Sequence, residues 1–280
     1  MDARIRLLNF QHIPNAIRLK DDAGWNQTSL DWQRFLSANP GGCFAAEIDS
    51  RLIGTSATII YGGKLAWIGM VIVDSAFRGQ GIGTALLKRA IDHLDSRKIR
   101  CMKLDATPQG RPLYERFGFV AEYGLERWML ERPKVEILAA KSHPDKLEAV
   151  MQMDRNVFGA DRGELLKSLA DCAPEFTLIA KDDAGIAGYA FGRPGSRADQ
   201  LGPWVARNED VGAILLDEFL RRSSREIIFV DCPDANKWAV PVVRERGFKL
   251  SRPLTRMYRG GNTSVGKPEL AGGSLGPEFG

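Results

Sequence analysis

A continuous apolar run, LAWIGMVIV from Leu65 to Val73, predicts a strand buried on both faces. After a polar, glycine-containing turn, apolar residues recur at helical spacing from Thr84 to Leu94. A second strand is predicted from Ile99 to Ala106. The order strand, turn, helix, strand is typical of an α/β unit.

The same order of landmarks returns in the second half of the chain. Strands are predicted there at Phe176–Ala180, Gly185–Gly192 and Ile227–Val230. Two pairs of matching landmarks are both offset by 129 residues: Leu86-Leu87 with Leu215-Leu216, and Gly118-Phe119 with Gly247-Phe248. An ordered repeat of this kind predicts two copies of one structural unit.

The repeat predicts three regions in the chain. Residues 1–131 form the first copy and residues 134–259 the second, with a linker around Pro133, because proline disfavours continuation of the preceding element. Residues 260–280 hold seven glycines and two prolines and are expected to be a flexible tail.

Composition narrows the class of protein. The 280 residues are 44% hydrophobic and 26% charged, as in globular proteins, and no apolar run approaches the ~20 residues of a membrane span. No secretory signal is visible, and the four cysteines form no CxxC pair, so we expect free thiols in the cytoplasm and no metal site. The net charge of +4 lies in the first 130 residues, which suits a small polyanionic ligand better than nucleic acid.

The turn between the first strand and its helix is rich in glycine, from Arg78 to Thr84 (RGQGIGT). Glycines accept positive φ angles and leave backbone N–H groups accessible, and the helix N-terminus adds partial positive charge. Together they form a candidate phosphate cradle. The turn lacks the lysine of a P-loop and the third glycine of a Rossmann fingerprint, and a purely structural turn is the alternative.

The spacing Arg78-x-x-Gly81-x-Gly83 resembles the coenzyme A pyrophosphate loop of GCN5-related N-acetyltransferases (GNATs). Downstream, Tyr114 stands four residues before Gly118, in the order in which that family places a tyrosine and a Gly-Phe pair. The resemblance implies an α/β (α+β) fold of two tandem GNAT-like domains, each with a mixed, mostly antiparallel sheet flanked by helices. It also implies acetyl-CoA as the acyl donor, used as a substrate. The donor would contact Val71, Val73, Arg78, Gly79, Gln80, Gly81, Ile82, Gly83 and Thr84.

The resemblance assigns Tyr114 as the acid that protonates the departing thiolate. The base is sought among carboxylates, because a primary amine is mostly protonated at neutral pH. Asp105, inside an apolar strand, and Glu47 are the candidates; a structural hydrogen-bonding role is the alternative for Asp105.

The resemblance also implies that the segment between the first two predicted helices, residues 21–29, shapes the acceptor pocket. Trp25 and Asn26 are candidate contacts, with Trp67 as a third. The alternative for this segment is a helix cap by Thr28 or Ser29, with Trp25 buried.

The second copy lacks the glycines and has Val243 in place of the tyrosine. We expect it to be inactive and to support or cover the acceptor side, with Gly192–Arg197 and Trp204 facing that side. The predicted function is acetyl transfer from acetyl-CoA to a primary amine of a small molecule or an amino terminus, by a monomer or homodimer without nucleic-acid or membrane partners. The alternatives are an O-acyltransferase, a user of longer acyl-CoAs, or a non-catalytic acyl-CoA-binding regulatory protein.

Overall fold

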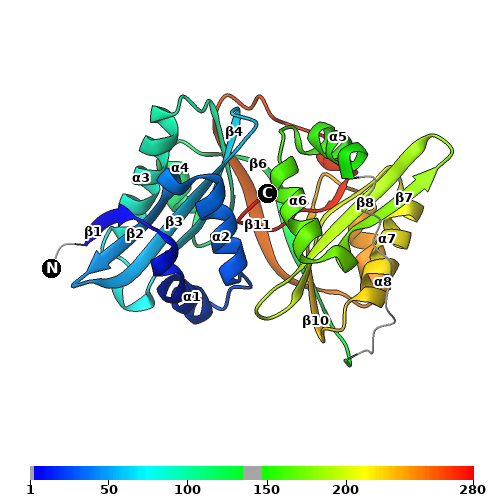
Figure 1. The fold of residues 1–280 in the computed structure, drawn as a ribbon, viewed down its shortest axis with the longest axis horizontal. Coiled ribbons are helices and arrows are strands. Elements are labelled where there is room, and N and C mark those ends of the chain that lie inside the picture. Colours follow the sequence, from blue (N-terminus) through cyan, green and yellow to red (C-terminus); the bar gives the residue numbers. More distant parts are fainter. Residues whose placement is uncertain (1–2, 135–146) are drawn as a thin grey trace.

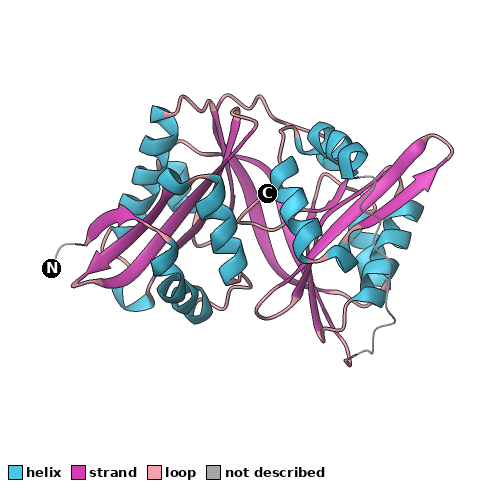
Figure 2. Ribbon diagram, in the orientation of Figure 1, coloured by secondary structure: helices cyan, strands magenta, loops and turns pink. Residues whose placement is uncertain are grey.

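The computed structural model describes residues 3–134 and 147–280. In this part of the chain, twelve strands belong to a single sheet that runs through two side-by-side halves (Figure 1). Helices flank the sheet in both halves (Figure 2). Most strand pairs are antiparallel, and β4–β5 and β9–β10 are parallel. The predicted mixed, mostly antiparallel sheet is therefore confirmed.

The first half follows the predicted order of strand, turn, helix and strand. Its elements are β1 (Arg4–Leu7), α1 (Ile13–Asp22), α2 (Ser29–Ala38), β2 (Cys43–Ile48), β3 (Arg51–Tyr61), β4 (Leu65–Val73), α3 (Ile82–Ser96), β5 (Cys101–Ala106), α4 (Arg111–Arg116) and β6 (Val120–Glu131). Trp67 in β4 belongs to the apolar cluster with α2, whereas its neighbours Ala66 and Ile68 belong to the cluster with α3. Both faces of β4 are thus buried, as its continuous apolar run predicts.

The second half repeats this order. Its elements are α5 (Leu147–Phe158), α6 (Gly163–Cys172), β7 (Leu178–Asp182), β8 (Gly185–Pro194), β9 (Asp199–Ala206), α7 (Glu209–Arg222), β10 (Ile227–Pro233), α8 (Ala239–Glu245), β11 (Lys249–Gly260) and β12 (Ala271–Gly273). By order, α7 corresponds to α3 and α8 to α4. No helix among the described residues is long and apolar enough to cross a membrane.

The two halves exchange their long strands. The central order of the sheet is β5-β11-β6-β10, so β11 of the second half pairs with β5 of the first, and β6 of the first half pairs with β10 of the second. β6 and β11 also pair with each other. The cut predicted between residues 131 and 134 separates the sequence repeats, but each half of the folded sheet contains a strand from the other.

Two buried ion pairs fix this exchange. Arg256 of β11 lies directly opposite Asp105 of β5 and binds it through two hydrogen bonds of 2.8 Å. Arg127 of β6 lies opposite Asp231 of β10 and binds it at 2.8 and 2.7 Å. Because a one-residue slip would separate both pairs, they fix the register of the exchanged strands.

The C-terminal segment differs from the expectation of a flexible tail. Residues 271–273 form β12 on β9, and the chain then turns into the space between the halves (Figure 1). The side chains of Leu275 and Phe279 are fully buried, and the ring of Phe279 stacks on that of Phe35 with centroids 4.7 Å apart. The glycine content suggested mobility, but apolar burial and pairing with β9 order the segment.

Candidate active site

The parallel strands β4 and β5 separate partway along their length. Their pairing covers Leu65–Trp67 with Cys101–Lys103, and both strands continue beyond it. A small pocket lies in the resulting opening, between Ile68–Val71 of β4 and Asp105 and Thr107 at the end of β5. Parallel strands that lose their hydrogen bonds leave unpaired backbone groups facing the opening, which a bound molecule can use.

A β-bulge in β4 lies at this opening. The pairing of β3 with β4 shifts register between Thr55 and Ala57, and Met70 takes a φ angle of 56°. The Thr55 hydroxyl donates a hydrogen bond of 2.8 Å to the Met70 carbonyl oxygen. Bulges redirect the backbone and are frequent beside active sites.

The glycine-rich turn follows the end of β4. Gly79 and Gly81 have φ angles of 77° and 79°, and Gly81 is the N-cap of the 15-residue helix α3. The turn lines a second pocket together with Val73 and with Arg116 of α4. The free N–H groups at the start of α3 and the two nearby arginines, Arg78 and Arg116, make this pocket suited to an anion.

The two pockets adjoin along β4 and α4. Val71 lines the small pocket and Val73 the glycine pocket; on α4, Tyr114 lines the small pocket and the adjacent Leu113 the glycine pocket. All the predicted donor-contacting residues except Gln80 line one of these two pockets, which follow each other from the helix N-terminus to the opening between β4 and β5.

Tyr114 reaches this opening from α4. Its ring packs edge-on against Phe119, with centroids 6.1 Å apart. Burial raises the pKa of Tyr114 to about 12. With this pKa the phenol is protonated at neutral pH. Among the described residues its hydroxyl has no hydrogen-bond partner, so its proton is available to a bound molecule.

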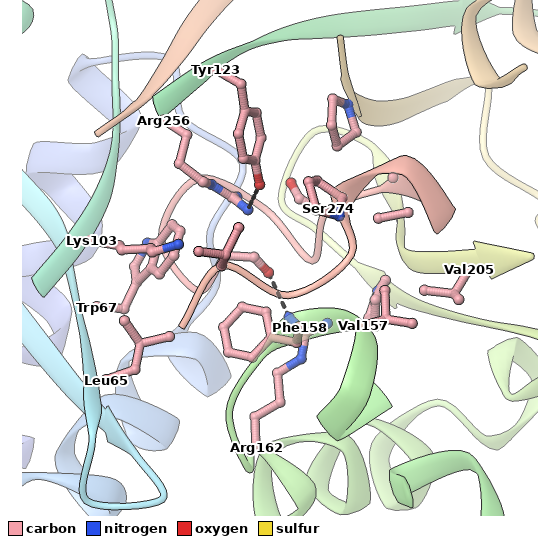
Figure 3. A pocket seen from close by; sticks show the side chains of 17 residues that line it. Leu65, Trp67, Lys103, Tyr123, Val157, Phe158, Arg162, Val205, Arg256 and Ser274 are labelled. Carbon is pink, nitrogen blue, oxygen red and sulfur yellow. Dashed lines mark hydrogen bonds between the residues drawn. The ribbon is translucent and has the colours of Figure 1, made fainter. Parts of the chain in front are cut away.

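Asp105 lies beside the same pocket but is held by Arg256. The Arg256 guanidinium also donates to the Tyr123 hydroxyl at 2.7 Å and lies over the Trp67 ring at 4.6 Å. Figure 3 shows Arg256, Tyr123 and Trp67 at a small cavity between the halves, across from Arg162 and Phe158. Burial raises the pKa of Asp105, and Arg256 opposes the shift. Both carboxylate oxygens are occupied, which matches the structural alternative for this residue.

Glu47 lies away from this group, on β2. Its carboxylate pairs with Arg6 and with His12 Nε2, both at 3.2 Å. It is not among the residues that line either pocket. The structure therefore brings Tyr114 and Asp105 to one pocket and leaves Glu47 outside it.

The three predicted acceptor contacts lie in different surroundings. Trp25 lines the small pocket. Asn26 is buried and hydrogen-bonded to the loop after β8: its Oδ1 accepts from the Arg197 and Ala198 N–H groups at 2.9 Å. Trp67 donates its Nε1 hydrogen to the Pro277 carbonyl oxygen at 2.9 Å. Thr28 caps α2 in a capping box with Asp31, as the structural alternative for this segment expects.

The second half contacts α2 of the first half. Arg193 of β8 donates to Asp31 of α2 at 2.8 Å and also binds Glu278. Trp204, in contrast, is buried in the core of the second half and donates to the Gly212 carbonyl oxygen.

Several residues of the small pocket are not among the predicted site residues, including Gln27, Arg252 of β11 and Glu278 of the C-terminal segment. Arg252 and Glu278 reach the pocket only through the strand exchange and the docking of the C-terminal segment. No motif marks them, because neither event has a local sequence pattern.

The corresponding opening of the second half is closed. β9 pairs with β10 only from Asp199 to Leu201, and β12 pairs with the end of β9 at Trp204 and Val205. The helix that follows, α7, begins with Glu209 and Asp210, which repel an anion at its N-terminus. Val243 is fully buried in α8. The described residues of this half therefore offer no anion cradle at α7 and no phenol on α8.

Comparison with known protein families gives two matches along the chain. Residues 9–119 match the family described as "Acetyltransferase (GNAT) family", and residues 150–269 match "Acetyltransferase (GNAT) domain". The uncharacterized N-acetyltransferase YitH of Bacillus subtilis (strain 168) is 25% identical over 258 residues, which cover 90% of each chain.

Solved structures share the whole fold. A Pyrococcus horikoshii structure described as that of an acetyltransferase superposes with a TM-score of 0.83 at 23% identity, over 99% of this chain and 96% of that one. A tandem GNAT protein from the clavulanic acid biosynthesis pathway superposes with a TM-score of 0.66 at 14% identity, over 92% and 98% of the two chains. At these identities the structures show a common fold.

Proposed function

The chain belongs to the GNAT family of acetyltransferases, and we propose that its first half transfers the acetyl group of acetyl-CoA directly to a primary amine. The chain is an acyltransferase with two GNAT domains in tandem. The observation that carries the proposal is the continuous path from the glycine-rich turn, along the end of β4, to Tyr114.

In this proposal each part of the path has one task. The N–H groups at the start of α3 bind the pyrophosphate of acetyl-CoA, with Arg78 and Arg116 adding positive charge. The backbone of β4 at Val71 and Val73 hydrogen-bonds the pantetheine arm, because the pairing of β4 with β5 ends at Trp67 and leaves these residues without a partner on the β5 side. The thioester then lies at the bulge beside Tyr114.

The reaction requires one bond to form and one to break. The lone pair of the neutral amine attacks the thioester carbonyl carbon to form the C–N bond, and the C–S bond breaks with its electron pair on sulfur. The thiolate takes the Tyr114 proton, and the nitrogen releases its extra proton to solvent water. A phenol is a suitable donor because it holds its proton until the thiolate appears.

The roles of the carboxylates follow their surroundings. Asp105 is engaged by Arg256 on both oxygens and Glu47 lies outside the pocket, so we propose that Asp105 maintains the site and that neither residue is the primary base.

The second half is proposed to support the acceptor side. Four free cysteines support the proposed location in a reducing cytoplasm.

Replacing Tyr114 with phenylalanine tests the proposal. We expect Tyr114→Phe to lower kcat at least about tenfold, a barrier increase of ~1.4 kcal/mol, because the thiolate loses its proton donor. The dissociation constant of CoA, measured by titration calorimetry, is expected to stay the same. Thiol release from acetyl-CoA with a panel of amines gives kcat.

Tyr258→Phe is the matched control, since Tyr258 lines neither pocket. Its kcat is expected to equal that of the unmodified enzyme. An unchanged kcat in Tyr114→Phe contradicts the acid role, and the absence of thiol release with every amine contradicts the proposed function.

A further inference from the structure

The acceptor side of the small pocket is formed by the C-terminal segment, residues 274–280. This segment lies directly on β4: a Cβ atom on Gly69 would lie 2.7 Å from the Glu278 carbonyl oxygen. Pro277 accepts the Trp67 hydrogen bond, and Tyr61 donates to the Phe279 carbonyl oxygen at 2.8 Å. Pro277 and Glu278 line the pocket itself.

Three polar atoms of pocket-lining residues are buried without a hydrogen-bond partner among the described residues. They are Gln27 Oε1, Arg252 Nε and Glu278 Oε2. The side chains of Gln27 and Glu278 are only 5% and 2% exposed. A buried polar atom without a partner costs free energy, so three at one pocket point to a ligand that satisfies them.

The charges of these groups define the ligand. Gln27 Oε1 and Glu278 Oε2 accept hydrogen bonds and suit an ammonium group, whereas the Arg252 guanidinium donates and suits an anion. Among the described residues Arg252 has no ion-pair partner, while Glu278 already binds Arg193 through Oε1. Charges of both signs surround Arg252, with Arg127 and Arg197 on one hand and Asp231 and Glu278 on the other, and none of them forms an ion pair with its guanidinium.

We propose that Gln27, Glu278 and Arg252 form an acceptor site for a compact amine that carries an anionic group, such as an amino acid. This inference rests on the proposed function and adds the acceptor class. Glu278 and Gln27 hold the amine, Arg252 binds the carboxylate, and segment 274–280 closes the far side. The free space is about 40 Å³, so the site favours a small acceptor over a polypeptide chain.

Paired substrates test the site. Thiol release is measured with amino acids, with the α-amide of each and with a tetrapeptide. We expect kcat/KM for amino acids to exceed that of their amides at least about tenfold. This is the effect expected from one charged hydrogen bond, between Arg252 and the carboxylate. The amide's amine is less basic and more often neutral, so its intrinsic reactivity works against this result. The tetrapeptide is expected to give no release.

Arg252→Gln removes the anion contact and keeps a polar side chain. It is expected to lower kcat/KM for amino acids about tenfold and to leave the values for the amides within about twofold. Arg207→Gln is the control, because Arg207 forms an exposed pair with Asp182 and does not line the small pocket. It should leave both values unchanged.

Binding is measured separately by calorimetry of amino acid and amide to the CoA-saturated protein. Equal use of acids and amides, unaffected by Arg252→Gln, overturns the acceptor site and leaves the proposed acetyl transfer intact. If no amine releases thiol, the proposed function fails. Preferential binding of the amino acid, lost in Arg252→Gln, then still supports the site, and its absence overturns it.

Discussion

At the scale of single residues, two buried aspartates have the same partner type in the same geometry. Asp105 and Asp231 each bind an arginine from the exchanged strand of the other half. A buried carboxylate with both oxygens bound to a guanidinium is a structural group, because its release would leave a charge without solvent. Asp105 and Asp231 lie in the corresponding strands β5 and β10, but the sequence alone could not identify partners more than 100 residues away.

Asp105→Asn is therefore expected to lower the free energy of unfolding, and not to act on kcat alone. Removing one member of a buried ion pair costs about 3–5 kcal/mol of the free energy of unfolding. The matched variant Asp231→Asn, in the half without a glycine turn, should lose a similar amount. Denaturant unfolding of both variants measures these values. If Asp105→Asn keeps full stability and loses only kcat, Asp105 is the base and the structural role is wrong.

The sequence predicts which residues lie near one another where this depends on the order of elements within one unit. The turn from Arg78 to Thr84 and Tyr114 in α4 belong to motifs within one unit, and in the structure they line two adjoining pockets. Arg252 and Glu278 come from strand exchange and a docked C-terminal segment. Those contacts depend on tertiary structure, which no local pattern encodes.

At the scale of elements, β4, the glycine-rich turn and α3 form one functional unit. The predicted strand Leu65–Val73 has the bounds of β4, since an apolar run on both faces ends where the sheet ends. The predicted helix start at Thr84 was two residues late, because Gly81 serves as the N-cap. Helix ends depend on backbone geometry, which hydrophobic spacing does not report.

Gly81→Ala tests this unit. Gly81 has open space around its Cβ position, so the cost comes from its φ angle of 79°. We expect a loss of about 1–2 kcal/mol in unfolding free energy. If the turn relaxes to a negative φ, the N–H groups at α3 lose their alignment, and acetyl-CoA should bind about tenfold more weakly.

Gly63→Ala provides the control for strain alone. Gly63, in the turn between β3 and β4, has a φ angle of 67° and equally open surroundings. A similar loss of stability with unchanged acetyl-CoA affinity is expected. Equal loss of affinity in both variants would show that the turn at Gly81 has no specific role in donor binding. Calorimetric titration and thermal unfolding provide the two readouts.

At the scale of the whole molecule, the exchange of β6 and β11 makes the halves interdependent. β5 has β11 as its neighbour and β10 has β6, so neither half contains the complete set of strands for its own part of the sheet. Loss of the partner strand exposes a row of unpaired backbone groups and the apolar side chains beneath it. The intact chain should therefore unfold in one transition.

Separate expression of residues 1–134 and 147–280 tests this dependence. Each fragment alone is expected to lack a cooperative unfolding transition, and mixing the two fragments should restore one. Circular dichroism during thermal unfolding, with size-exclusion chromatography of the mixture, measures both. A fragment 1–134 that unfolds cooperatively with the melting temperature of the intact chain contradicts the role of the exchange.

The strand exchange also limits how such a protein can change over generations. The second half can lose its glycine turn and its tyrosine without harm to the first, because neither supports the sheet. It cannot be deleted, because β11 and its Arg256 would be lost with it, leaving Asp105 unpaired beside the site. A duplicated gene with this topology can lose the active-site residues of one half, but it has to keep the strands of both halves.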